Sequence, residues 1–435
     1  MNKTITNPLV PVLLIFLSAV AAWLPSLLFP FSIVVLLAGS MLTIADSKVV
    51  LVIALPFVLL AILLMSLGEP SLRYAQSDFV SYYNNYLSFL PFIDSGISSY
   101  NQINRFPYGG GLEVGLPIIH FLFANIIQAP TPFSVKLFHI ILLETLLIVA
   151  FYVIAKKYKL NIRSFIILLC FVFVFIKFGG IFNHLRQSYA SLLMIIALFS
   201  ESRNLKRALF LVSCSFHLSS LLLYPIYRWL LFSRVNFKKI ILLLVSLSFL
   251  LGILVPLVLE AVAATFYSGL FLDKIFWSFY RSQEEGSVLN NLSSIAIRLA
   301  YLVPIILFCV VTKTTRNHVF EISLFTGIVV LSFWFLPSLP IRVFQIIFLI
   351  LMGYLYFMSF GRGGRGGLLS NIILILFLSA HMFLWSSNVF YFYEFPEFST
   401  IPFSYVSLLT EESYFIDRLG LPSYEVFIES NSYEN

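Results

Sequence analysis

Long apolar runs, separated by short basic clusters, dominate this sequence and limit what it can fold into. Only 11% of its residues are Asp, Glu, Lys or Arg, compared with roughly a quarter in an ordinary soluble domain. A soluble core cannot bury so much apolar surface, so lipid must be part of the solvent. We therefore predict an all-α polytopic integral membrane protein. The apolar runs lie near 8–29, 31–45, 49–67, 133–155, 164–177, 183–200, 240–259, 291–311, 319–336, 341–360 and 368–388.

The basic clusters predict how these helices are oriented. The net charge of +7 comes largely from residues grouped between the apolar runs, which is typical of membrane topology rather than of nucleic-acid binding. If every cluster is cytoplasmic, one transmembrane domain covers 1–388, with outer loops at 68–132 and 260–290 and an extracytoplasmic tail at 389–435. The clusters are Lys156–Arg163, Arg203–Arg207, Arg234–Lys239, Lys313–Arg316 and Arg362–Arg365.

Two apolar segments do not fit ordinary spans under this orientation. Both ends of 116–128 lie outside, and about thirteen residues is short for a span, so we predict an interfacial or re-entrant helix. Both ends of 208–232 lie in the cytoplasm, which predicts a re-entrant hairpin of two short helices with His217 near its turn. The prediction is thus about eleven transmembrane helices plus that hairpin. At the N-terminus a first helix is favoured over a cleaved signal peptide, which Ala19-Val20-Ala21 also resembles.

Several arginines remain for the outer side or the outer half of the membrane. Arg186 and Arg298 lie about one and two turns inside predicted helices, and Arg342 begins another. Arginine in an apolar helix is costly and normally faces a cavity or an anionic partner. Contact with lipid phosphates is one explanation. We favour a vestibule for an anionic headgroup, because guanidinium groups bind phosphate with paired hydrogen bonds. Arg281 is a weaker candidate, since two neighbouring glutamates could neutralise it.

Two motifs lie in the predicted outer loop. At helical spacing Asp78, Tyr82 and Tyr86 share one face, which places a carboxylate beside aromatic rings that could stack on a sugar. Glu113 follows the segment Arg105–Gly111 and leads into the predicted interfacial helix. Ordinary solvation of loop carboxylates is the alternative for Asp78 and Glu113.

Two further motifs lie in apolar segments. Segment 215–220 places His217 at a turn rich in hydroxyl groups. A buried histidine is commonly a packing residue, but the expected break at membrane depth favours a functional role for this one. Segment 183–190 carries a polar face on a predicted continuous helix. The residues of that face are Asn183, Arg186, Gln187 and Ala190.

Taken in order, these motifs resemble the EpsG family of polysaccharide repeat-unit polymerases, which are related in role to the Wzy-type O-antigen and capsule polymerases. The resemblance spans roughly residues 49–360. Its most specific part is the Arg-Gln and Phe-His-x-Ser pair, about thirty residues apart with a basic turn between. It implies a fold similar to the GT-C membrane glycosyltransferases. The matching motifs are Asp78-x3-Tyr82, Asn183-x2-Arg186-Gln187-x2-Ala190, Phe216-His217-x-Ser219 and Arg342-x-Phe344.

The resemblance implies polymerisation of undecaprenyl-pyrophosphate-linked oligosaccharide units at the outer leaflet of the bacterial inner membrane. Its partners would be these glycans, membrane lipid and a chain-length regulator protein, with no nucleic acid. The acceptor hydroxyl needs a base, for which His217, Asp78 and Glu113 are candidates in that order. Arg186 would stabilise charge on the departing pyrophosphate. We predict no cofactor and no metal, because no Asp-x-Asp motif occurs. Residues expected to bind substrate are Arg342, Arg298, Arg281, Gln187, Asn183, His184, Tyr82 and Arg105.

Three other functions remain open. A lipid-linked oligosaccharide flippase would also need cations for a pyrophosphate, but it needs polar residues through both halves of the membrane. An O-antigen ligase or another lipid-phosphate glycosyltransferase would share the fold and most of the site. An acyltransferase that modifies surface sugars would use His217 as its base and leave the arginines unexplained.

Overall fold

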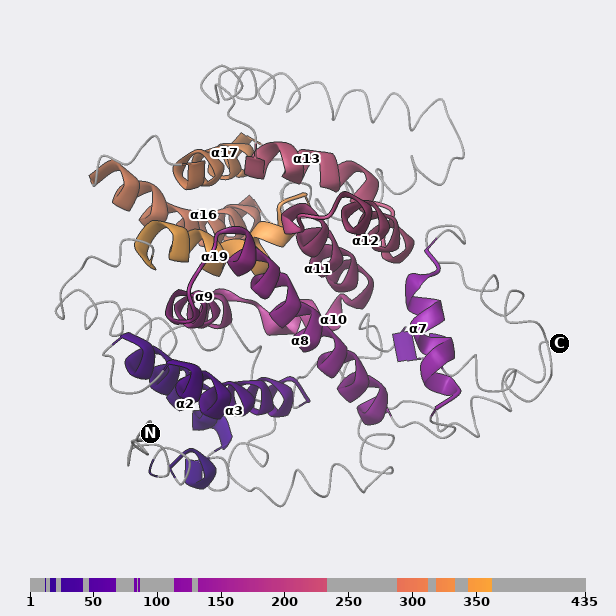
Figure 1. Cartoon of the computed structure of the whole chain (residues 1–435). Coiled ribbons are helices and arrows are strands. Elements are labelled where there is room, and N and C mark those ends of the chain that lie inside the picture. Colours follow the sequence, from indigo (N-terminus) through magenta and orange to yellow (C-terminus); the bar gives the residue numbers. More distant parts are fainter. Residues whose placement is uncertain are drawn as a thin grey trace, which may run out of the picture. The chain divides into compact units, whose positions relative to one another are not determined.

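In the part of the chain that the computed structural model describes, every regular element is a helix (Figure 1). These residues fall into two compact units, one ending at Tyr224 and the other beginning at Pro225. The described residues are 12, 16–20, 25–41, 47–67, 82, 83, 85, 86, 113–126, 132–232, 288–311, 318–332 and 343–361.

Helix α8 (Pro132–Lys157) contains the segment best suited to cross a membrane. By length and composition, its 24 residues from Ser134 to Lys157 are the one such stretch among the described residues, and the other apolar stretches there are shorter. The total of about eleven transmembrane helices therefore stays a prediction. The predicted division between the runs 8–29 and 31–45 is wrong, because α2 (Pro25–Met41) continues through Pro30. A proline need not end a helix whose neighbours support it.

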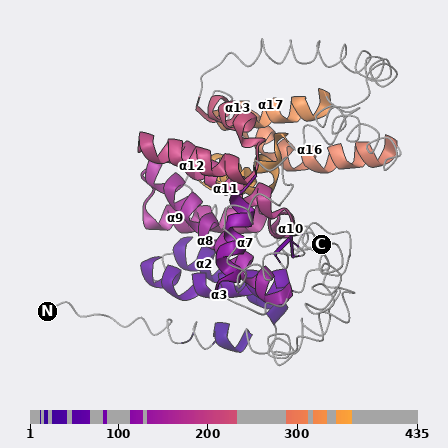
Figure 2. The same ribbon diagram turned by 90° about the vertical axis from the view of Figure 1, so that its right-hand side faces the viewer.

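The first unit is built around one helix that is buried on nearly all sides. Helix α2 packs on α3 (Ser47–Leu67), and α9 (Ile162–Phe175) packs on both and on α8 (Figures 1 and 2). Every residue of α9 from Ile166 to Phe175 is buried, as expected of a helix that is apolar around its whole circumference. These helices position α11, which carries part of the site.

The turn from α8 to α9 is fixed by local hydrogen bonds. Lys159 has a φ of 51°, Leu160 N–H donates to the Ala155 carbonyl and Lys159 N–H to the Lys156 carbonyl. This is a Schellman cap with lysine at the left-handed position that glycine usually takes. Asn161 then caps α9 by accepting a hydrogen bond from Ser164 N–H. The basic cluster at 156–159 therefore belongs to one ordered end of α8.

The predicted helix over 183–200 is broken near its start. Helix α10 (Phe178–Asn183) ends at His184, whose ψ of 60° is not helical, and α11 (Leu185–Phe199) begins directly after it. The Ser188 hydroxyl donates to the Ile181 carbonyl at 2.6 Å, an oxygen that a continuous helix would pair with the backbone of residue 185. Asn183 and Arg186 therefore lie on two different helices, and not on the one continuous helix that was expected.

The predicted break at His217 is present. Helix α12 (Arg203–Phe216) ends there with extended backbone, φ −153° and ψ 117°, and α13 (Ser220–Phe232) follows. The rings of Phe210 and Tyr224 lie 4.6 Å apart, whereas fourteen residues of continuous helix would separate them by about 21 Å. The chain therefore bends back at this point, as the predicted hairpin requires. Its depth in a membrane stays a prediction.

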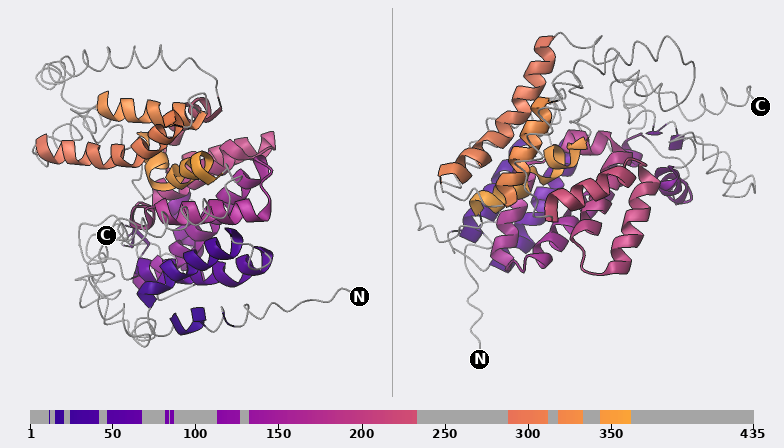
Figure 3. Two further views of the ribbon diagram at one scale, coloured as in Figure 1. Left: turned by 90° about the vertical axis from the view of Figure 1, so that its left-hand side faces the viewer. Right: turned by 90° about the horizontal axis from the view of Figure 1, so that it is seen from above.

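The second unit contains α16 (Val288–Val311) and α17 (His318–Ser332), which pack side by side (Figure 3). A short helix, α19 (Met352–Tyr356), lies between two π-helical segments, η3 (Ile347–Leu351) and η4 (Phe357–Gly361). The Tyr356 hydroxyl donates to the Tyr301 carbonyl at 2.8 Å, which ties α19 to α16. The predicted helices at 240–259 and 368–388 lie outside the described residues.

Candidate active site

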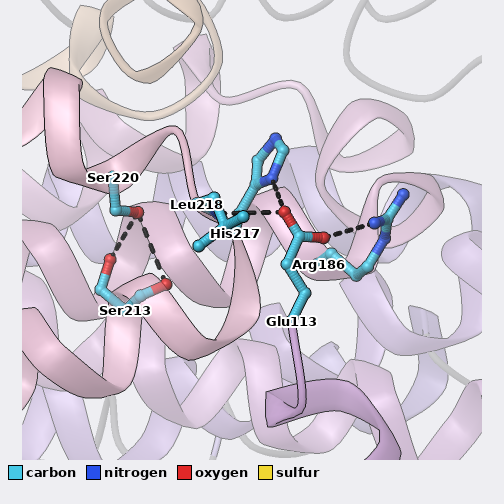
Figure 4. Close-up of polar contacts among 6 residues, drawn as sticks. All are labelled: Glu113, Arg186, Ser213, His217, Leu218 and Ser220. Atoms are coloured by element: carbon cyan, nitrogen blue, oxygen red, sulfur yellow. Dashed lines mark hydrogen bonds and ion pairs between the residues drawn. The ribbon is translucent and has the colours of Figure 1, made fainter. Parts of the chain in front are cut away.

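Two polar side chains and one backbone N–H from distant parts of the first unit meet at Glu113 (Figure 4). Its Oε2 accepts a hydrogen bond from Arg186 Nη1 at 2.5 Å. Its Oε1 accepts from His217 Nδ1 at 2.7 Å and from the Leu218 backbone N–H at 3.0 Å. The Glu113 side chain is 4% exposed, while those of Arg186 and His217 are 28% and 31% exposed. A buried carboxylate thus holds two partly exposed groups that could meet a substrate.

The helix break at His217 makes part of this arrangement possible. In a continuous helix the Leu218 N–H would donate to the carbonyl of residue 214, but here it is directed at Glu113. Ser213 stabilises the turn from within the preceding helix. Its hydroxyl group forms hydrogen bonds with the Ala190 carbonyl at 2.9 Å and with the Ser220 hydroxyl at 2.8 Å. The hydroxyl-rich sequence therefore orders the break rather than contacting the carboxylate.

Glu113 is placed by the start of α7 (Gly115–Ala124) and by a close approach to α12. Gly115 lies against the Phe216 ring, and a Cβ at that position would come within 2.7 Å of Phe216 Cγ. Only glycine permits this separation without displacing the ring, which precedes His217. Helix α7 has ten residues, which agrees with the predicted short helix over 116–128. The carboxylate also stands at the electropositive N-terminal end of that helix.

The environment keeps Glu113 ionised. Burial alone would raise its pKa, but the hydrogen bonds from His217 and Leu218 and the charge of Arg186 outweigh burial and lower the pKa to about 2. Hydrogen bonds to the charged form and nearby positive charge both favour a carboxylate over its acid. At neutral pH the position is therefore a fixed negative charge.

The geometry also fixes the tautomer of His217. Because the ionised Glu113 can only accept, the proton on the facing edge of the imidazole must sit on Nδ1. In the neutral ring Nε2 then carries the lone pair. A carboxylate that orients an imidazole in this way stabilises the imidazolium formed when Nε2 takes a proton. The arrangement suits general-base chemistry.

An aromatic ring completes the described site. The Arg186 guanidinium carbon lies 6.0 Å from the centre of the Tyr82 ring, within the range of a cation–π contact. Tyr82 and Tyr86 are buried, so in this conformation the Tyr82 ring faces the guanidinium rather than solvent. Stacking of Tyr82 on a sugar stays a prediction.

Of the residues singled out from the sequence, the structure brings Glu113, Arg186, His217 and Tyr82 together. His184 is exposed and Gln187 is partly exposed beside Arg186. Arg298 lies on α16 in the second unit, so its convergence with Arg186 stays a prediction. The remaining residues lie outside the described part of the chain: Asp78, Arg105, Arg281 and Arg342.

Sequence reasoning missed two features of the site. It ranked Glu113 last among the possible bases and did not predict that the carboxylate would link Arg186 to His217. It also missed two buried histidines, His120 and His139, that lie close by. Their signal was present, since each is an isolated imidazole in an otherwise apolar segment. Within the described ranges no three His, Cys, Asp or Glu side chains are grouped to hold a metal ion, and metal-independent catalysis stays a prediction.

The described part of the chain is helical, with one helix long and apolar enough to cross a membrane, and this indicates the class of helical membrane proteins. A model of the EpsG family matches residues 53–405, which is most of the chain, and the protein belongs to this family. The family resemblance read from the motifs is thereby confirmed. Membership indicates a polysaccharide polymerase type of role. No curated protein and no solved structure matches the chain.

Proposed function

We propose that this protein polymerises lipid-linked oligosaccharide repeat units into a surface polysaccharide, O-antigen, capsule or exopolysaccharide. The observation that carries the proposal is the cluster of Glu113, Arg186 and His217 in a member of the EpsG family. The cluster offers a base and a cation side by side, and a glycosyl transfer from a pyrophosphate carrier needs both.

In the proposed reaction, a sugar hydroxyl of the incoming unit attacks the anomeric carbon of the growing glycan on undecaprenyl pyrophosphate. A new C–O bond forms, and the C–O bond to the pyrophosphate breaks with its electron pair leaving on the carrier. His217 Nε2 takes the hydroxyl proton. Arg186 lies beside it and stabilises the negative charge that develops on the pyrophosphate. Undecaprenyl pyrophosphate glycans are thus both donor and acceptor.

The charge balance of the cluster supports this assignment. With Glu113 ionised, Arg186 positive and His217 neutral, the three groups sum to zero before reaction. Once His217 holds the proton, the cluster carries one positive charge, at the moment when the leaving group gains negative charge. The positive charge of the cluster thus increases as the negative charge of the leaving group develops. Such an environment stabilises the transition state more than the bound substrate.

The positions of the basic clusters support a site at the outer leaflet of the inner membrane. Lys157 Nζ lies 5.2 Å from the centre of the Phe199 ring, at the C-terminal end of α11. Arg186 is at the other end of α11, thirteen residues away, or about 20 Å along the helix. Basic clusters mark the cytoplasmic side in a bacterial membrane protein. The site would then lie on the opposite side of these helices.

The test is a deletion strain complemented with the wild-type gene or with Arg186→Ala. Loss of a polymerase leaves single repeat units, capped on the lipid A core or held on the carrier. Loss of a ligase leaves long polymer on the carrier, and loss of a flippase leaves units facing the cytoplasm. Arg186→Ala should give the single-unit pattern with the protein still present in the membrane. Either of the other two patterns in the deletion strain contradicts the proposal.

A further inference from the structure

A hydrogen-bonded network of four buried side chains lies next to the site. Asn85 Oδ1 is 3.0 Å from His120 Nδ1, and His120 Nε2 is 3.0 Å from His139 Nε2. His139 Nδ1 is in turn 2.9 Å from the Tyr189 hydroxyl. Both histidines and the tyrosine are essentially inaccessible to solvent. We call these four residues the histidine network.

Its hydrogen bonds run in one direction. The Asn85 carbonyl oxygen can only accept, so His120 must donate from Nδ1 and, as a neutral ring, accept at Nε2. His139 must then donate from Nε2 and accept at Nδ1, which leaves the Tyr189 hydroxyl as donor to His139. The two histidines are thereby fixed in opposite tautomers, Nδ1–H for His120 and Nε2–H for His139.

Each end of the network is a short distance along the chain from a site residue. Asn85 follows Tyr82 by three residues, and Tyr189 follows Arg186 by three. His120 lies on α7, two turns beyond Glu113. The fourth site residue is reached through packing, because the Tyr189 ring stacks on Phe216 with centroids 5.0 Å apart, and Phe216 precedes His217.

His139 supplies the anchor for these contacts. It stands on α8, the longest described helix, and α8 packs against α11. The network therefore ties the segment with Tyr82, the helix start with Glu113 and the helix with Arg186 to one rigid element. A hydrogen bond fixes distance and direction more tightly than apolar packing, which is non-directional.

We propose that His120 and His139 are positioning residues, which hold Glu113, Arg186 and His217 in the geometry needed for transfer. The proposal rests on the proposed function for its kinetic consequence only. Its geometric consequence, that the bond between His217 and Glu113 depends on the network, holds whatever the reaction is.

The kinetic test compares substitutions at His139 that remove or retain both hydrogen bonds. His139→Phe keeps an aromatic ring and loses donor and acceptor, whereas His139→Gln keeps an N–H donor and an oxygen acceptor. Rates are measured with purified enzyme on lipid-linked units extracted from the deletion strain and are normalised to folded protein. We expect His139→Phe to lower kcat about ten- to a hundredfold with KM near the wild-type value, and His139→Gln to recover most of the rate. His318→Phe, a histidine change in the second unit, is the control.

The spectroscopic test needs no reaction. The chain has six histidines, so ¹⁵N-histidine labelling gives a spectrum that single substitutions can assign. We expect Nδ1–H for His120 and His217 and Nε2–H for His139, with the His217 signal altered in His139→Phe and unchanged in His139→Gln.

The outcomes separate the two proposals. If the wild-type enzyme does not polymerise the extracted units, the proposed function is contradicted. The His217 signal then still tests the role of the histidine network, because it does not depend on the reaction. Two results would overturn the positioning role. One is a His139→Phe enzyme that polymerises with the wild-type kcat per folded molecule. The other is a His217 signal that this substitution does not alter.

Discussion

Replacing Glu113 by glutamine tests the central carboxylate with the smallest change in shape. The amide can still accept from His217 Nδ1 and Leu218 N–H through one oxygen. Its NH₂ group would then face Arg186 Nη1 across a 2.5 Å contact, where two donors meet. The opposite orientation is worse, because the NH₂ group would face two donors rather than one. We therefore expect glutamine to retain the imidazole contact, release Arg186 and remove the negative charge that stabilises protonated His217.

The size of the effect follows from these losses. General-base catalysis contributes about 10²–10⁴ in rate, and most of that depends here on the charge behind His217. The pKa of Glu113 falls from 4.5 to about 2 in the folded protein, which corresponds to about 3 kcal/mol of preference for the charged form. Glu113→Gln should therefore lower kcat by at least about 10² and also lower the thermal stability of the purified protein.

The assay is polymer length and single-turnover rate with lipid-linked units, normalised to folded protein. The matched control is Glu321→Gln, because Glu321 also pairs with a histidine, His318 at 3.5 Å, but is partly exposed and lies in the second unit. We expect the control to keep wild-type activity. Polymer of wild-type length, made at the wild-type rate by Glu113→Gln, would refute the assignment of this carboxylate.

Four further predictions concern neighbouring features. Arg186→Lys keeps the positive charge but loses the planar guanidinium group with its paired donors. We expect its polymerisation rate to lie between those of the wild type and Arg186→Ala, and the rate of Arg186→Ala to be at least about 10² lower than the wild-type rate. Gly115→Ala should displace Phe216 and cost about 1–3 kcal/mol, whereas Gly327→Ala on α17, where a Cβ would meet neighbours at 3.6 Å or more, should be tolerated in thermal melts. The pKa of Glu113 is lower in the folded than in the unfolded chain, so between the two pKa values the unfolded chain binds one more proton. The stability of the folded protein should therefore fall as the pH drops from about 4.5 towards 2. Glu113→Gln should remove this contribution to the pH dependence. EDTA should leave the activity of the purified enzyme unchanged, and its loss on chelation would overturn metal-independent catalysis.

The local features of the hairpin could be predicted from the sequence, because local residues determine them. A histidine among serines, between segments with basic ends, predicts a break, and the break is found at His217. The length of the apolar run likewise predicts the helix over 133–155. The limits are also local. The break at His184, where the Ser188 hydroxyl pairs with the Ile181 carbonyl, divides a run that apolar patterning predicts as one helix.

The partners of Glu113 could not be predicted, since they are 73 and 104 residues away in the sequence. Nothing in a single sequence specifies which of several loop carboxylates meets which histidine. The decisive local signal was Gly115, a glycine at the start of an apolar helix. Its meaning depends on the contact with Phe216, a residue distant in the sequence, so only the folded structure reveals it.

The structure explains why an apolar chain keeps a charged residue at this place. A buried carboxylate is costly unless hydrogen bonds and positive charge surround it, and Glu113 has three donors, two of them from the turn that ends α12. Because α12 ends at His217, the Leu218 N–H makes no helical hydrogen bond and donates to the Glu113 carboxylate instead. The carboxylate in turn fixes the backbone at this turn. Two local features that are each unfavourable alone therefore stabilise each other. Part of His217 and part of Arg186 stay exposed, and these are the two groups that the proposed transfer requires.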